Sequence, residues 1–199
     1  MAKELNYHDE QNKKNILKLR ELLAGLPAFC TQFFRGIEDT TAARTRIAYA
    51  YDLRIFFEFL HENNSVCAKM EIVDFPLSIL NEIGREDIEE YMEYLSYYVK
   101  DGVEYMNDER GKKRKLASLR SFYNYYFRNE LISQNPAVLV PLPKLHDKEI
   151  IRMEPNEVAI LLDEVEDGSG LTRKELSYHK KTRLRDLALL TLLLGTGIR

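Results

Sequence analysis

TRIAYAYDLRIFFEFL, at residues Thr45–Leu60, predicts a helix that is buried on almost every side. At 100° per residue, one side carries Tyr49, Leu53, Phe56 and Leu60, and the other carries Ile47, Tyr51, Ile55 and Phe59. A helix that is apolar all round lies inside a protein rather than at its surface. We therefore expect this helix to form the centre of a small bundle, with Tyr49, Phe56 and Phe57 as core residues rather than base-stacking platforms.

Helical signals continue on both sides of this stretch, whereas strand-like alternation is nowhere sustained. Further helices are predicted at residues 9–24, 28–35, 85–99, 112–129, 154–166 and 187–194. Asp39, Thr40 and Thr41 offer capping groups for the central helix. Residues 171–185 have the pattern of a charged loop. The expected fold class is all-α.

The distribution of charge along the chain is strongly uneven. The net charge of −3 by itself argues against a nucleic-acid partner. However, Asn81–Glu109 has ten acidic residues against two basic ones, whereas Arg110–Arg128 has seven basic residues and no acidic one. A local basic stripe matters more for DNA binding than the sum of charges. The acidic run Glu86–Glu93 is most simply a solvated helix face.

The helix predicted at residues 112–129 divides into an aromatic face and a basic face. The first face carries Leu116, Leu119, Phe122, Tyr123 and Tyr126. The second carries Lys113, Arg114, Arg120, Ser121, Asn124 and Arg128, with no carboxylate among them. A helix whose lysines are merely solvated usually interleaves glutamates four residues away. On the residues alone, nucleic-acid contact and a solvated surface remain two open interpretations.

Composition argues against several other classes of protein. Only Cys30 and Cys67 are present, and charged residues interrupt any secretory leader, which together favour the cytoplasm. The longest apolar run, Leu187–Leu194, is well short of the roughly 20 residues of a membrane span. Its side chains are nevertheless apolar enough that we expect another part of the protein to cover them. The four histidines lack metal-ligand spacing, so we expect no metal site.

Four blocks of this chain share a common resemblance, at Thr45–Phe56, Arg114–Tyr125, Met153–Leu162 and Arg185–Arg199. Together they resemble the tyrosine site-specific recombinases, the phage integrase and Xer family. The last, Arg185–Arg199, is similar to the family's first catalytic-arginine motif, and Thr45–Phe56 is similar to the signature helix of its core-binding domain. Arg114–Tyr125, followed by Leu131-Ile132 and Asn135-Pro136-Ala137, resembles the last long helix of that domain and its exit. Met153–Leu162 resembles the opening helix of the catalytic domain.

The resemblance implies a SAM-like core-binding helical bundle that forms half of a clamp around DNA. It places this domain at residues 1–135, an interdomain linker at 136–151, where Pro136, Pro141 and Pro143 disfavour a helix, and the beginning of the catalytic domain at 152–199. The family cuts DNA through a 3′-phosphotyrosyl link without a metal or nucleotide cofactor. Arg199 matches the arginine that grips the phosphate being cut, whereas the matching lysine, His-x-x-Arg box and nucleophilic tyrosine would follow it.

We accordingly expect DNA binding without cleavage from these 199 residues. The expected partners are a double-stranded DNA recombination site and other recombinase protomers, with no cofactor, small-molecule substrate or membrane. The candidate DNA-binding residues are Thr45, Arg46, Lys112, Lys113, Arg114, Lys115, Ser118, Arg120, Ser121 and Arg128. Two alternatives stay open: a naturally truncated regulator that binds DNA without strand exchange, and a helical protein-interaction module that uses the acidic run Glu86–Glu93.

Overall fold

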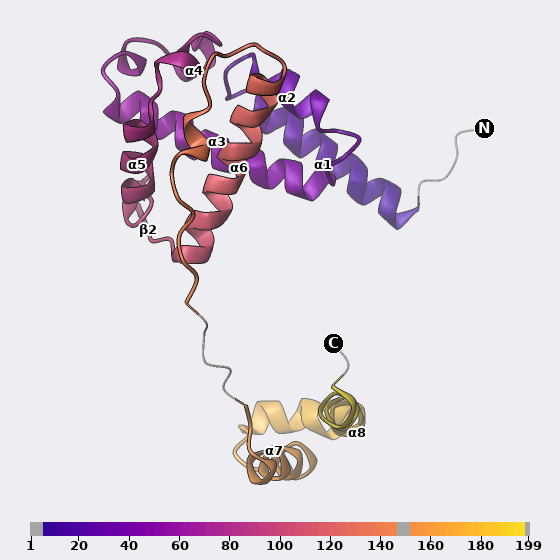
Figure 1. Cartoon of the computed structure of the whole chain (residues 1–199). Coiled ribbons are helices and arrows are strands. Elements are labelled where there is room, and N and C mark those ends of the chain that lie inside the picture. The colour runs from indigo at the N-terminus through magenta and orange to yellow at the C-terminus, as the bar shows by residue number, and fades with distance from the viewer. Residues whose placement is uncertain (1–5, 147–151, 198–199) are drawn as a thin grey trace, which may run out of the picture. The chain divides into compact units, whose positions relative to one another are not determined.

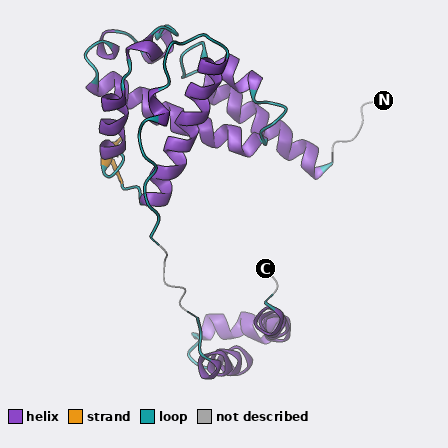
Figure 2. Cartoon of the chain, in the orientation of Figure 1, coloured by secondary structure: helices purple, strands orange, loops and turns teal. Residues whose placement is uncertain are grey.

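Two compact units, Met1–Leu145 and His146–Arg199, make up the chain in the computed structural model (Figure 1). The structure describes residues 6–146 and 152–197. The first unit contains α1 (Tyr7–Leu23), α2 (Cys30–Gly36), α3 (Ala43–Asn63), α4 (Ile79–Glu82), α5 (Arg85–Tyr94) and α6 (Glu109–Arg128). The 3₁₀ turns η1 (Cys67–Lys69), η2 (Ile72–Asp74) and η3 (Pro136–Val138) and a hairpin of β1 (Tyr98–Lys100) and β2 (Val103–Tyr105) complete this unit. The predicted all-α class is confirmed (Figure 2).

Helix α3 lies at the centre of the first unit, as its sequence predicts. It packs against α1, α5 and α6, and Leu53, Phe56, Phe57 and Leu60 are at most 1% exposed. The ring of Phe122 from α6 meets Phe57 of α3 edge-on, with 6.0 Å between centroids. This contact, with the other buried aromatic rings of the core, fixes how α6 lies on α3 and therefore which face of α6 remains outside.

The hairpin is a feature that helical periodicity did not predict. Helix α5 ends at Tyr94, and the chain folds back through Asp101 and Gly102, whose φ angles are 51° and 75°. Positive φ at both central residues is what a two-residue hairpin turn of type I′ requires, and Asp-Gly is a favoured pair for it. The expected helix at 85–99 was therefore wrong beyond Tyr94.

Two other local predictions were wrong. Helix α3 begins after its N-cap residue Ala42 and has no side-chain cap, and the Thr40 hydroxyl donates to the Ile37 carbonyl at 3.3 Å instead. The charged loop expected at 171–185 is mostly helix. There Thr172 and Glu175 form a capping box that starts α8 at Arg173, and a charged helix shows no apolar period by which to recognise it.

The second unit consists of α7 (Pro155–Asp167) and α8 (Arg173–Thr196). Gly168, at φ 72°, ends α7, and His179 Nε2 of α8 lies 2.7 Å from the Val165 carbonyl oxygen. Neither helix has a buried residue among those described, and the leucines at 189, 192, 193 and 194 are 42 to 53% exposed. Within the described ranges, no helix is long and apolar enough to cross a membrane.

Candidate nucleic-acid interface

Helix α6 presents its basic residues because its apolar face is fully committed to the core. Leu116, Leu119, Phe122, Tyr123 and Tyr126 are at most 1% exposed. The carboxylate of Asp108 accepts a hydrogen bond from Gly111 N at 2.8 Å and caps the helix at its N-terminus. A capped helix held along one whole face can keep the other face in a fixed orientation.

The outward side of α6 carries a regular stripe of side chains. We call it the outer stripe, and it consists of Arg114, Ala117, Ser121, Asn124 and Arg128. These residues are spaced three and four apart, so they follow one face over about 21 Å at 1.5 Å per residue. Each is exposed except Ser121, which is half-buried. The outer stripe therefore offers a cation near each end, two hydrogen-bonding side chains between them and no carboxylate.

A hollow of about 380 Å³ adjoins the Arg128 end of the outer stripe. Its lining consists of Ile37, Ser121, Asn124, Tyr125, Arg128 and Asn129. Among the residues that the structure describes, no carboxylate is paired with Arg128. An unpaired guanidinium beside polar side chains can donate to a phosphate with two parallel hydrogen bonds.

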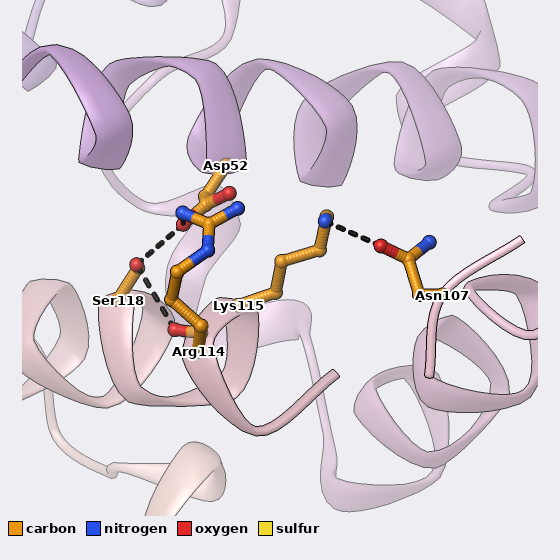
Figure 3. A network of polar contacts seen from close by, with 5 residues as sticks. All are labelled: Asp52, Asn107, Arg114, Lys115 and Ser118. Atoms are coloured by element: carbon orange, nitrogen blue, oxygen red, sulfur yellow. Dashed lines mark hydrogen bonds and ion pairs between the residues drawn. The ribbon is translucent and has the colours of Figure 1, made fainter. Parts of the chain in front are cut away.

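The other end of the outer stripe is joined to α3 by a polar network (Figure 3). Asp52 of α3 is 2% exposed, and one of its carboxylate oxygens accepts hydrogen bonds from Arg114 Nη1 at 2.5 Å and from Ser118 Oγ at 2.7 Å. The Arg114 side chain nevertheless stays 50% exposed. The guanidinium is thus bound to protein on one side and open to solvent on the other.

Lys115 has a different environment from its neighbour Arg114. Its residue exposure is 7%, and its ammonium donates to Asn107 Oδ1 at 2.6 Å (Figure 3). Burial lowers the pKa of Lys115 from its usual value, and the nearby Asp52 carboxylate partly offsets that effect. Lys115 and Ser118 were both expected at the DNA surface, but the structure turns them inward as parts of the polar network.

The other residues that the sequence predicted for DNA contact form two groups. Some side chains have no hydrogen-bond or ion-pair partner among the described residues, and others already bind another side chain. Thr45 is exposed in the first turn of α3, and Lys113 is half-buried on α6. Lys112 donates to Ser96 Oγ at 2.5 Å. Arg46 is 8% exposed and binds Glu38 at 2.8 Å. Arg199 lies outside the described residues.

Arg120 was expected on the basic face, and the structure gives it internal partners instead. Its Nε donates to the Ala137 carbonyl at 3.0 Å, and its Nη2 donates to the Val140 carbonyl at 2.6 Å. These bonds hold the first residues of the predicted linker against α6, where Pro136, Ala137 and Val140 are buried. Arg120 therefore attaches the exit of the domain to α6.

Sequence reasoning missed the part that Asp52 plays. The signal was a carboxylate that falls among apolar residues on the helical wheel, three residues after Tyr49 and four before Phe56, where an unpaired charge would be costly. Which cation would pair with Asp52 could not be read from the sequence, because several other elements separate α3 from α6 along the chain.

Comparisons with known proteins agree over most of the chain. The tyrosine recombinase XerC of Caldanaerobacter subterraneus subsp. tengcongensis is 32% identical over 159 residues, which cover 76% of this chain and 40% of that relative. XerC of Leptospira interrogans is 30% identical over 82% of this chain and 43% of the relative. The tyrosine recombinase XerD of Shewanella oneidensis is 28% identical over 83% of this chain and 43% of the relative.

The chain spans less than half the length of these curated relatives. No family model and no solved structure matches it.

Proposed function

Because the chain belongs to the tyrosine recombinase family, we propose that it is the DNA-binding portion of a site-specific recombinase and contacts duplex DNA through the outer stripe. The single observation that carries this proposal is the arrangement of Arg114, Ser121, Asn124 and Arg128 along the outward face of α6, where no acidic residue of that helix lies among them and only Ser121 is half-buried. Lys113, next to Arg114 on α6, and the exposed Thr45, in the first turn of α3, are further candidates for phosphate contact.

The dimensions of the outer stripe suit a DNA groove. The major groove is about 12 Å wide and admits a helix. With about 21 Å between its ends, the stripe is long enough for Arg114 to reach one sugar-phosphate backbone while Arg128 reaches the other. Ser121 and Asn124 would then face base edges, where an asparagine amide can pair with adenine.

Charge reversal tests this interface. We propose measuring the binding of the 199-residue chain to duplex DNA for the triple variant Lys113→Glu, Arg114→Glu and Arg128→Glu. Binding should fall below detection, because phosphate attraction becomes repulsion. A matched variant with Lys13→Glu, Lys14→Glu and Lys69→Glu has the same change in net charge on exposed residues outside α6, and it should keep most of the affinity. If the two variants lose affinity equally, the outer stripe is not the interface.

The proposal extends to the chemistry of the whole recombinase. Together with other protomers, the whole recombinase would cut and rejoin DNA strands in the cytoplasm. In the phosphodiester transition state, negative charge grows on the non-bridging oxygens, and Arg199 would stabilise it with a bidentate guanidinium. The nucleophilic tyrosine would follow Arg199 in the family's order, so the 199-residue chain should bind DNA without cutting it.

A suicide substrate that traps a phosphotyrosyl link tests the catalytic part of the proposal. The 199-residue chain should form no adduct. In a recombinase that continues past Arg199, Arg199→Lys should keep DNA affinity and lose about 2 to 4 kcal/mol of transition-state stabilisation. A tyrosyl adduct on the short chain, or unchanged cleavage by the lysine variant, would contradict these catalytic roles.

DNA binding also separates this proposal from the protein-interaction alternative. In the structure the acidic run Glu86–Glu93 lies on α5, where Glu89 pairs with Arg85 at 2.7 Å. A chain that did not retard duplex DNA at any salt concentration would favour an interaction role for that acidic face.

A further inference from the structure

We propose that Asp52 is a positioning residue, which holds the Arg114 guanidinium in the orientation that contacts a DNA phosphate. This inference rests on the proposed function and deepens it, because it assigns to a buried carboxylate on α3 a part in DNA binding by α6. The carboxylate itself does not touch DNA, since it is 2% exposed.

The geometry leaves most of the N–H donors of the Arg114 guanidinium available for a phosphate. Asp52 occupies Arg114 Nη1 at 2.5 Å, and a guanidinium has five N–H donors in one plane. With the side chain 50% exposed, the remaining donors have access to solvent. An arginine fixed at one nitrogen loses less conformational freedom when a phosphate binds at the others.

Ser118 fixes the carboxylate in turn. Its hydroxyl donates at 2.7 Å to the same Asp52 oxygen that Arg114 binds. Arg114 and Ser118 lie four residues apart, so one turn of α6 supplies both groups that bind this carboxylate oxygen. Figure 3 shows both side chains reaching the carboxylate from the same helix.

Stability alone is a weak reason for this arrangement. The second Asp52 oxygen is buried without a hydrogen-bond partner among the described residues. Burial of a carboxylate costs solvation free energy, and its partner Arg114 is half-exposed, so the ion pair contributes little net stability. The negative charge also does not abolish the attraction for DNA. Lys115 places a second cation near Asp52, so the group of Asp52, Arg114 and Lys115 keeps a net positive charge when Lys115 is protonated.

Asp52→Asn separates positioning from simple electrostatics, because the two explanations predict opposite changes in DNA affinity. If Asp52 acts only as a negative charge near DNA, its removal should tighten binding. If it positions Arg114, its removal should weaken binding by about 2- to 10-fold, the effect of freeing one long side chain. The control is Glu58→Gln, which removes the same charge from the same helix where Glu58 binds Lys100 at 2.5 Å. This control should bind DNA as well as the parent chain or slightly better.

Coupling to Arg114 shows whether the effect acts through that residue. Affinities are measured for the folded protein at one salt concentration for Asp52→Asn, Arg114→Ala and the double variant. In the Arg114→Ala background, Asp52→Asn should no longer weaken binding. An equal loss in both backgrounds means that Asp52 only supports the fold, and tighter binding means that it only repels DNA; either result overturns the inference.

Ser118→Ala provides a second route if Asp52→Asn does not fold. Removing the hydroxyl frees the carboxylate, so DNA binding should weaken in the parent chain and stay unchanged in the Arg114→Ala background. Failure of the proposed function gives a different result, because the parent chain would then not bind DNA or Arg114→Ala would have no effect. If Arg114→Ala weakens DNA binding but neither Asp52→Asn nor Ser118→Ala changes the affinity, only the positioning role is rejected.

Discussion

At the scale of single residues, two buried tyrosines carry hydroxyl groups without a hydrogen-bond partner among the described residues. Tyr91 is 1% exposed and Tyr123 is fully buried. Tyr126, equally buried, instead donates to the Phe29 carbonyl at 2.7 Å. A buried hydroxyl that pairs with nothing costs about 1 to 3 kcal/mol, whereas a paired one contributes about 1 kcal/mol.

Tyr91→Phe and Tyr123→Phe should therefore each raise the free energy of unfolding by about 1 kcal/mol. Tyr126→Phe is the matched control, and it should lower the free energy of unfolding by a similar amount because it leaves the Phe29 carbonyl unpaired. Urea unfolding of the three variants measures these changes. If all three lose stability alike, the hydroxyls of Tyr91 and Tyr123 have partners after all.

The same tyrosines predict how stability depends on alkaline pH. Burial raises the pKa of Tyr91, Tyr123 and Tyr126, and it raises the pKa of Tyr94 to about 12. A tyrosine ionises near pH 10 in the unfolded chain, so its stabilisation is present below that pH and is lost as the pH rises toward the folded-state pKa. Stability should fall above about pH 10, by up to about 1.4 kcal/mol per pH unit for each tyrosine.

Unfolding measured at pH 9, 10 and 11 tests this slope, which the Tyr91→Phe/Tyr123→Phe double variant should reduce. A double variant that loses stability as steeply as the parent chain would assign the alkaline transition to other groups.

At the scale of elements, the close approach of α2 and α6 depends on a glycine. A Cβ atom built on Gly36 would lie only 2.3 Å from the Tyr125 ring. Gly36→Ala should therefore push α2 away from α6 and cost about 1 to 3 kcal/mol of stability. Gly25→Ala is the control, because a Cβ there meets only a carbonyl oxygen at 3.8 Å. Thermal unfolding of both variants should show a loss for Gly36→Ala alone, and equal midpoints would contradict this packing of α2 on α6.

Sequence periodicity predicted the long helices of the first unit and the directions of their faces. Helix α3 is apolar on nearly every side, and α6 has an apolar face and a basic face at helical spacing. The pattern of apolar residues was therefore enough to predict both helices and their buried faces. Periodicity failed at the hairpin, where the decisive signal was the turn pair Asp101-Gly102, and at the start of α8, where it was the Thr172 capping box.

For the candidate site, the same periodicity correctly placed Arg114, Asn124 and Arg128 on the outside of α6. It could not predict which partners neighbouring side chains would find. Arg120 binds carbonyls 17 and 20 residues away, and Asp52 binds Arg114 62 residues away. Such contacts depend on how the elements pack, which a single helix does not encode.

At the scale of the whole molecule, the division of the chain between a DNA-binding domain, a linker and the start of a catalytic domain stays a proposal. The structure packs residues 136–140 onto the first unit, so we expect the exposed connection to begin at Pro141. Pro141, Leu142, Lys144 and Leu145 are all exposed, and they lie next to the boundary between the two units. A protease can therefore reach the chain at this point.

Limited proteolysis should cut first within residues 141–152 and release a stable helical piece from the N-terminal side, because exposed connections are cleaved before packed elements. Mass spectrometry of the earliest products locates the cut. Early cleavage at Pro136–Val140, or one resistant species that contains both units, would contradict this organisation.

The dependence of DNA affinity on salt tests the central claim most directly. Binding of the 199-residue chain to duplex DNA should weaken steeply as salt increases, since each neutralised phosphate releases counterions. In a plot of log affinity against log salt concentration, Arg114→Ala and Arg128→Ala should each reduce the slope by about 0.9. Affinity that does not change with salt, or slopes that both substitutions leave unchanged, would contradict DNA binding through the outer stripe.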